Sequence, residues 1–233
     1  NHPAALAHSS HFAMVFEWDI PEARRLIAKA NEINPLNPDV IIRDVEMLMR
    51  SGQYAKASNR IHDALNNDPK SPVLLMYLIG SYQAQGLIEK ADEFATQALA
   101  ISPYAQYPIH LRSIALSNRK QFSEAEKMLK EAIAADDNNP VSVMSLGVVY
   151  WKQGKKEEAL ELLAELLNEA HFSYIKSDII IRFYAAMGDE DNAVKWIERA
   201  IELREPGVFY LTWGSLTDDL LQDERVTKLY KDA

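Results

Sequence analysis

Residues 140–166 read PVSVMSLGVVYWKQGKKEEALELLAEL, and Ala159 in this stretch sets the register of the whole chain. It belongs to a series of six alanines that recur every 34 residues: Ala23, Ala57, Ala91, Ala125, Ala159 and Ala193. A fixed period of this length indicates one supersecondary unit copied along the chain, in which each copy buries its apolar face by stacking on its neighbours. The sequence therefore predicts a repeat array.

Other columns of this frame indicate that each unit is a pair of helices. With the register alanine at position 20, position 27 is alanine in all units except the fifth, and position 11 is large and apolar throughout. Small residues opposite large ones let two helices cross closely. The turn between the helices is marked at position 15 by Gly52, Gly86, Gly154 and Gly188, and the end of the second helix at position 32 by Pro35, Pro69 and Pro103.

The fifth unit carries Leu146-Gly147, Tyr150, Gly154 and Ala159 in the spacing of the tetratricopeptide repeats, which the chain resembles over roughly residues 4–207. The resemblance is not uniform. Larger residues replace the small residue of position 8 in several units, which predicts wider or shifted helix packing there. The last three units lack the closing proline, and the first unit has Trp18 and Asp19 instead of the turn glycine.

The resemblance implies an all-α, right-handed α-solenoid of about six 34-residue helix–turn–helix repeats over residues 1–207. The units begin at Ala4, Pro38, Pro72, Gln106, Pro140 and Tyr174. Residues 208–233 leave the frame, and their apolar side chains, among them Leu229, are expected to form capping helices on unit six because a solenoid needs a covered end.

In this family the first helices line a concave groove through positions 2, 5, 6, 9, 12 and 13 of each unit. The resemblance therefore implies a module that binds a protein or peptide partner there. The candidate groove residues are Arg43, Glu46, Arg50, Met76, Tyr77, Gln83, His110, Ile114, Met144, Val148, Trp151, Lys152 and Arg182, with Tyr107 and Asp178 at further groove positions.

One known use of the family, a clamp of lysines and asparagines that holds a partner's terminal carboxylate, is not expected. Position 5 of units two and three is Ile42 and Met76, and position 9 of unit two is Glu46, so a carboxylate finds no paired cation. Methionines and aromatic residues favour an amphipathic helix or extended segment held by a few anchors. Tyr77 and Trp151 are the preferred anchors, with packing against neighbouring helices as the alternative for both rings.

Composition excludes several classes of function. The net charge of −9 repels phosphate backbones, so no nucleic-acid binding is expected. No apolar run approaches the ~20 residues of a membrane span, and no membrane contact is expected. The lack of cysteine excludes disulfides and thiolate chemistry, but it does not choose between the cytoplasm and an oxidising space. The cytoplasm is the expected compartment, with the periplasm left open. Because the chain begins with Asn1, we expect it to be a piece of something longer. The tail from Leu220 to Val226, with Leu229, resembles the ends of repeat regions in bacterial signalling proteins, which implies the C-terminal repeat region of a bacterial multidomain regulator.

Candidates for chemistry are weak, so neither catalysis nor a cofactor is expected. His8 and His11 have helical spacing with His2 nearby, but no carboxylate or cysteine clearly completes a metal site. The glutamates between Glu157 and Glu169 fit a solvated helix face, with a docking strip for a basic partner as the alternative. No nucleophile stands beside a histidine in a recognisable motif, and no glycine-rich phosphate loop occurs.

Two alternatives to partner recognition remain. The array could self-associate and oligomerise a larger regulatory protein, with Phe12, Val15 and Phe16 as the contact surface. It could also sense a small ligand for a fused domain, which requires a pocket lined by groove polar groups such as His110 and Arg182.

Overall fold

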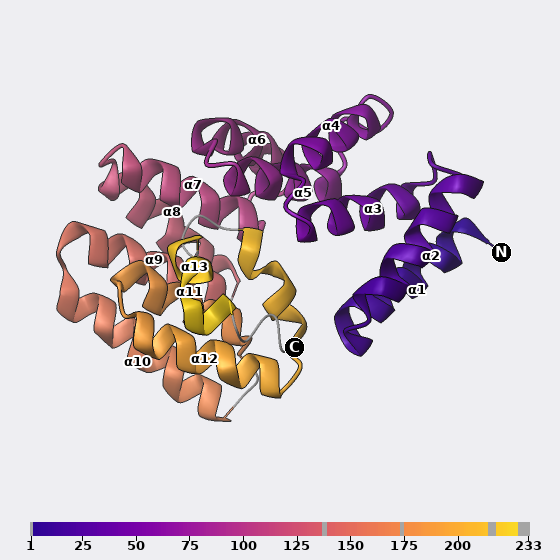
Figure 1. The fold of residues 1–233 in the computed structure, drawn as a ribbon. Coiled ribbons are helices and arrows are strands. Elements are labelled where there is room, and N and C mark those ends of the chain that lie inside the picture. Colours follow the sequence, from indigo (N-terminus) through magenta and orange to yellow (C-terminus); the bar gives the residue numbers. More distant parts are fainter. Residues whose placement is uncertain (1, 137–138, 173–174, 214–217, 228–233) are drawn as a thin grey trace.

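The computed structural model describes residues 2–136, 139–172, 175–213 and 218–227, and every regular element within these ranges is a helix. The chain forms a right-handed α-solenoid of six helical hairpins (Figure 1). Tyr174, where the sequence frame starts unit six, and Leu229 lie outside the described residues.

We call the first helix of each hairpin inner and the second outer. The inner helices are α1 (Pro3–Phe12) with its π-helical continuation η1 (Ala13–Glu17), α3 (Pro38–Arg50), α5 (Pro72–Ala84), α7 (Gln106–Asn118), α9 (Pro140–Gln153) and α11 (Ser177–Met187). The outer helices are α2 (Ile20–Ile33), α4 (Tyr54–Leu65), α6 (Ile88–Ile101), α8 (Phe122–Ala135), α10 (Lys156–Phe172) and α12 (Glu190–Glu202). Helices α3, α5, α7 and α9 begin at the residues where the sequence frame starts units two to five.

The turns inside the hairpins share one backbone conformation. Gly52, Gly86, Gly154 and Gly188 have φ between 70° and 84°, the left-handed region that glycine enters without steric cost. The first and fourth units reach the same conformation without glycine, at Trp18 (φ 61°) and Lys120 (φ 60°). The 34-residue frame therefore fixes the turn even where its usual residue is missing.

The register alanines lie at the most tightly packed positions of the array. All six have a relative exposure of 0%. The contact between units five and six is closer still, because the ring of Phe183 on α11 lies directly over Gly147 on α9, where any Cβ atom would overlap it. Small residues at these positions let neighbouring helices approach closely.

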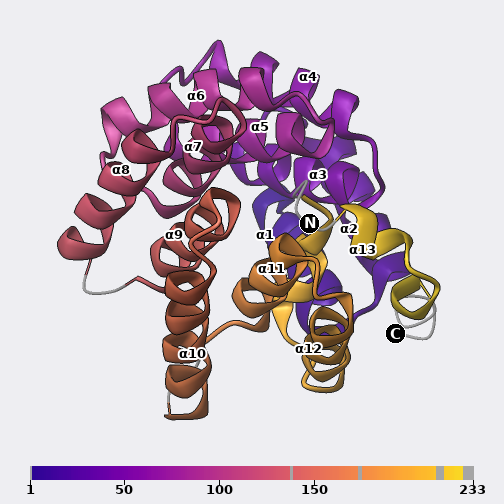
Figure 2. The same ribbon diagram turned by 90° about the vertical axis from the view of Figure 1, so that its left-hand side faces the viewer.

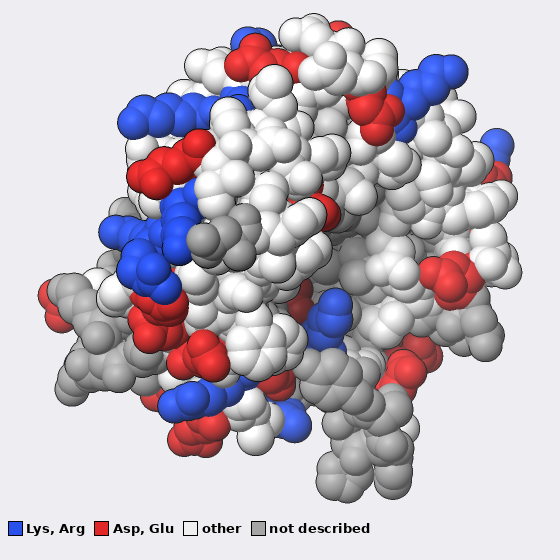
Figure 3. Space-filling model, turned by 90° about the vertical axis from the view of Figure 1, so that its right-hand side faces the viewer, with Lys and Arg blue, Asp and Glu red and all other residues white. Residues whose placement is uncertain are grey.

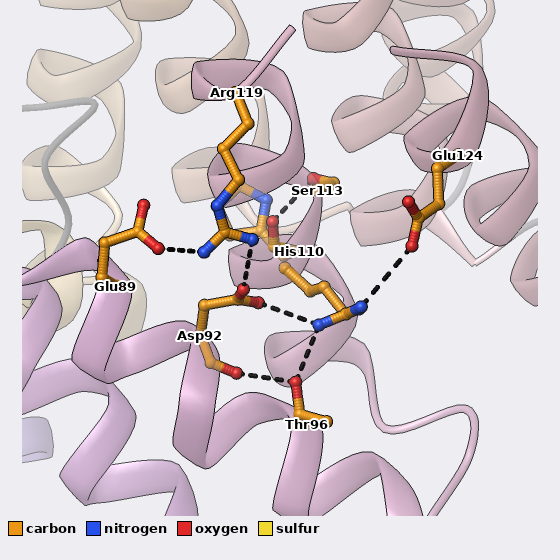
Figure 4. A network of polar contacts seen from close by, with 8 residues as sticks. Glu89, Asp92, Thr96, His110, Ser113, Arg119 and Glu124 are labelled. Carbon is orange, nitrogen blue, oxygen red and sulfur yellow. Dashed lines mark hydrogen bonds and ion pairs between the residues drawn. The ribbon is translucent and has the colours of Figure 1, made fainter. Parts of the chain in front are cut away.

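A polar network joins units three and four (Figure 4). The buried Asp92 on α6 accepts hydrogen bonds from Arg112 Nη1 on α7 at 3.3 Å and from Arg119 Nη1 at 2.8 Å. Glu89 also pairs with Arg119, and Glu124 of α8 lies 3.6 Å from Arg112. Asp92 thus ties the outer helix of one unit to the inner helix of the next.

The array curves until its last unit approaches its first (Figures 1 and 2). The 3₁₀ helix η2 (Pro206–Trp213) contacts α11 and α12 of unit six and also η1, α3 and α5 across the hollow. Trp18 packs both on the core of the first hairpin and on the C-terminal core, which includes Leu211 of η2 and Leu220 of α13 (Asp218–Gln222). The C-terminal segment therefore covers unit six and also fills part of the concave face.

Among the described residues, none of the helices has both the length and the apolar character needed to cross a bilayer.

Candidate binding cavity on the concave face

A cavity of about 370 Å³ opens between the inner helices of units three to six. Four of its lining residues, Met76, His110, Met144 and Asp178, occupy position 5 of successive units and so repeat along the wall every 34 residues. The complete lining is Met76, Tyr77, Gln106, Tyr107, His110, Val141, Met144, Lys176, Asp178, Ile179 and Arg182.

The walls of the cavity are mainly apolar. Met76, Val141 and Met144 contribute flexible or branched apolar surface, and the rings of Tyr77 and Tyr107 add aromatic surface. The Tyr107 hydroxyl donates to Gln83 Oε1 at 2.7 Å, and burial raises the pKa of Tyr107 to about 12. A ligand of this cavity therefore meets an apolar surface with few polar groups.

His110 is a buried polar group of the wall, at 3% relative exposure. Its Nδ1 lies 2.8 Å from Ser145 Oγ, and the Ser145 hydroxyl donates to the carbonyl of Val141 at 2.7 Å. Within the described part of the chain, Nε2 is buried without a hydrogen-bond partner. Burial, with the positive charges of Arg182 and Lys152, lowers the pKa of His110 to about 3, so the imidazole is neutral.

The charged end of the cavity lies at unit six, where Lys176, Asp178 and Arg182 come together. Arg182 Nε lies 3.9 Å from Asp178 Oδ2, and burial raises the pKa of Asp178 although Arg182 opposes this shift. A Cβ atom on Gly207 of η2 would lie 3.0 Å from Asp178 Oδ1, so η2 borders this end.

Glu46 is buried at 2% exposure beneath this concave face. It accepts hydrogen bonds from Arg43 Nη1 at 2.7 Å and from the Tyr77 hydroxyl, and its Oε2 lies 3.0 Å from His11 Nδ1. Burial alone would raise the pKa of Glu46, but the hydrogen bonds with His11, Arg43 and Tyr77 outweigh burial and lower it. These side chains hold units one, two and three together, so Glu46 is not open to a partner.

The other sequence-predicted groove residues do not form one surface. Five of the thirteen line the cavity: Met76, Tyr77, His110, Met144 and Arg182. Gln83, Ile114 and Val148 are buried in the array, Arg50 is half-buried, and the exposed Lys152 lies 3.4 Å from Asn118. Trp151 lines a separate hollow with Leu160 and Met187, and Lys156 Nζ lies 5.0 Å from its ring centroid. The two preferred anchors, Tyr77 and Trp151, thus lie apart.

Gln106, Val141, Lys176 and Ile179 also line the cavity, although the sequence did not single them out. Val141 and Ile179 stand at positions 2 and 6 of their units, where the groove columns could have identified them. Gln106 and Lys176 lie at the N-terminal ends of α7 and α11 outside those columns, and no pattern marks them.

Charged side chains of both signs surround a largely uncharged, hollowed face in Figure 3. At the N-terminal end of the array, Phe12 and Phe16 are 52% and 54% exposed, and their rings stack with centroids 5.2 Å apart. Val15, which the sequence groups with them, is instead buried at 2%. In the described ranges, no cluster of His, Cys, Asp or Glu side chains has the geometry to hold a metal ion.

Family models described as tetratricopeptide repeat match residues 118–177 and 182–206. The TPR repeat-containing protein YpiA of Bacillus subtilis (strain 168) is 26% identical over 229 residues, which cover 97% of this chain and 53% of that protein. The Hsp70-Hsp90 organising protein of Plasmodium falciparum is 29% identical over 119 residues, 51% of this chain and 46% of that protein. The chain thus spans about half the length of the curated relatives it matches.

The fold is also that of solved structures. A tetratricopeptide repeat protein from Parabacteroides merdae superposes with a TM-score of 0.59 at 19% identity, over 99% of this chain and 91% of that one. At this identity the likeness concerns the fold alone.

Proposed function

Because the chain belongs to the tetratricopeptide repeat family, whose fold is generally a protein–protein interaction module, we propose that its concave cavity binds a segment of a partner protein. The observation that carries the proposal is that inner helices of four successive units wall one cavity of about 370 Å³. Pockets that recognise ligands are concave and mostly apolar, with a few placed polar groups, as this one is.

The size of the cavity limits what it holds. A volume of about 370 Å³ is near the lower end of the ~300–1,000 Å³ range of ligand pockets. It therefore suits one large side chain of an extended segment rather than a whole helix, with η2 already lying along part of the hollow. With few buried anchors, we expect a Kd in the micromolar range, about −8 kcal/mol.

Peptides selected from a random display library on the immobilised chain test this proposal. Met76→Glu places a carboxylate in the half-buried wall of the cavity and is expected to abolish binding of the selected peptides. The matched control, Leu36→Glu, changes a side chain that is 73% exposed between α2 and α3 and should leave binding unchanged. Equal binding by both variants, with helicity intact, places the site outside the cavity.

A second candidate function is self-association through the first unit. The observation that favours it is the exposed, stacked pair of Phe12 and Phe16, because water-exposed aromatic pairs commonly mark contact surfaces. Light scattering over a concentration series should then show a rising mass that Phe12→Ser/Phe16→Ser abolishes. A constant monomer mass removes this candidate.

A further inference from the structure

We propose that the cavity selects an aromatic side chain that carries a hydrogen-bond donor, the indole of tryptophan or the phenol of tyrosine, which donates to Nε2 of His110. The inference rests on the proposed function and names the anchor that the partner segment inserts. Three features of the cavity support it: the tautomer of His110, its protonation state and the composition of the walls.

The hydrogen bonds around Ser145 fix the tautomer of His110. A serine hydroxyl has one hydrogen, and that of Ser145 is donated to the carbonyl of Val141 at 2.7 Å. In the 2.8 Å hydrogen bond between His110 Nδ1 and Ser145 Oγ, the donor must then be Nδ1–H. In a neutral imidazole with its hydrogen on Nδ1, Nε2 is an acceptor only. His110 therefore has a lone pair at Nε2, which is buried and accepts no hydrogen bond from the described residues.

The surroundings of His110 keep this lone pair free of a proton. Burial, with the nearby charges of Arg182 and Lys152, lowers the pKa of the imidazole to about 3. At neutral pH, Nε2 accordingly cannot act as a donor, so it forms no hydrogen bond with the oxygen of a bound carboxylate or carbonyl. A buried acceptor without a partner is costly, so a ligand that supplies an N–H or O–H restores the missing hydrogen bond.

The rest of the wall suits an aromatic ring. Met76 and Met144 line the cavity, and methionine sulfur makes favourable contacts with aromatic rings. Val141 and Ile179 complete an apolar surface. Tryptophan and tyrosine are the side chains that combine a large apolar ring with a hydrogen-bond donor, whereas phenylalanine leaves Nε2 unpaired.

A pair of probes of nearly equal shape tests the inference. N-acetyl-tryptophanamide carries the indole N–H, and the corresponding amide of 3-benzothienylalanine replaces that N–H with sulfur. We expect the unaltered chain to bind the indole about 10- to 100-fold more tightly, measured by NMR titration of the His110 ring signals. His110→Phe should bind both probes equally, because the acceptor is gone.

Ser145→Ala serves as a second variant in case His110→Phe does not fold. It frees Nδ1 and lets the other tautomer form, so preference for the indole should shrink while the ¹⁵N shifts of His110 report the change. Three results would overturn the inference: the unaltered chain binds both probes equally, it binds neither probe, or its preference for the indole survives His110→Phe. If Met76→Glu still abolishes peptide binding in such a case, the proposed function stands without the inference about His110. If free indole binds as tightly as a selected peptide, the cavity is a site for a small ligand and not for a peptide side chain.

Discussion

Gly147→Ala tests the packing between units five and six. A Cβ atom at Gly147 would lie 2.7 Å from Cε1 and 3.0 Å from Cε2 of Phe183, and closer still to Cζ. The ring is fully buried in a core that includes Val143, Leu166 and Ile180, so it cannot swing aside. Overpacking of this kind costs about 1–3 kcal/mol, and contacts this short favour the upper end. Alanine recovers about 1 kcal/mol of helix propensity, which leaves a net loss of about 2 kcal/mol.

Urea unfolding followed by circular dichroism measures this loss as a lower midpoint. The control is the same substitution in a Phe183→Ala background, where the obstructing ring is gone and Gly147→Ala should be neutral or stabilising by up to about 1 kcal/mol. A Gly147→Ala variant that is more stable than the unaltered chain, with Phe183 in place, would refute the packing described for these units.

Three further predictions concern stability. Asp92→Asn removes the charge that binds two arginines between units three and four and should cost about 1–3 kcal/mol in urea unfolding. Glu205→Ala removes the carboxylate that accepts from Ser177 N at 2.9 Å and Ser177 Oγ at 2.8 Å, and should selectively speed hydrogen exchange in α11. Burial lowers the pKa of His110 from 6.5 to about 3 in the fold, so as the pH falls the unfolded chain takes up a proton on this imidazole before the folded chain does. The free energy of unfolding should therefore drop by about 2 kcal/mol from pH 7 to 5, an effect that His110→Phe removes.

Each of these predictions has a contrary result. An Asp92→Asn variant as stable as the unaltered chain would show that this network does not stabilise the contact between units three and four. If Glu205→Ala leaves hydrogen exchange in α11 unchanged, the Glu205 carboxylate does not stabilise the N-terminal end of that helix. Equal pH dependence with and without His110 would show that this imidazole is not held neutral.

The sequence predicted the repeat architecture well because every 34-residue unit must satisfy the same local packing and turn requirements. Each unit must bury a register alanine and reverse its chain after the inner helix, and both demands are met within one 34-residue unit. The frame holds even at Lys120, where no glycine marks the turn. It also identified the position-5 column, from Met76 to Asp178, that lines the cavity.

The frame could not predict how much of the concave face is free. Whether a groove position is open depends on the curvature that accumulates over six units and on the segment after the last repeat. The burial of Glu46 arises from partners on three units, His11, Arg43 and Tyr77, and η2 crosses the hollow from outside the frame. The contacts of Glu46 with His11 and Tyr77 join different units, and those of η2 come from a segment outside the repeats, so the periodic pattern of one unit does not report them.

Photocrosslinking tests the central claim, that the concave cavity is the recognition surface, most directly. A benzophenone-bearing amino acid replaces Val141 in the cavity wall, or Lys127 on the outer helix α8, whose side chain is 79% exposed. Selected peptides should crosslink to the cavity position and not to the outer one. Crosslinking at the outer position alone, or equally at both, would contradict the claim.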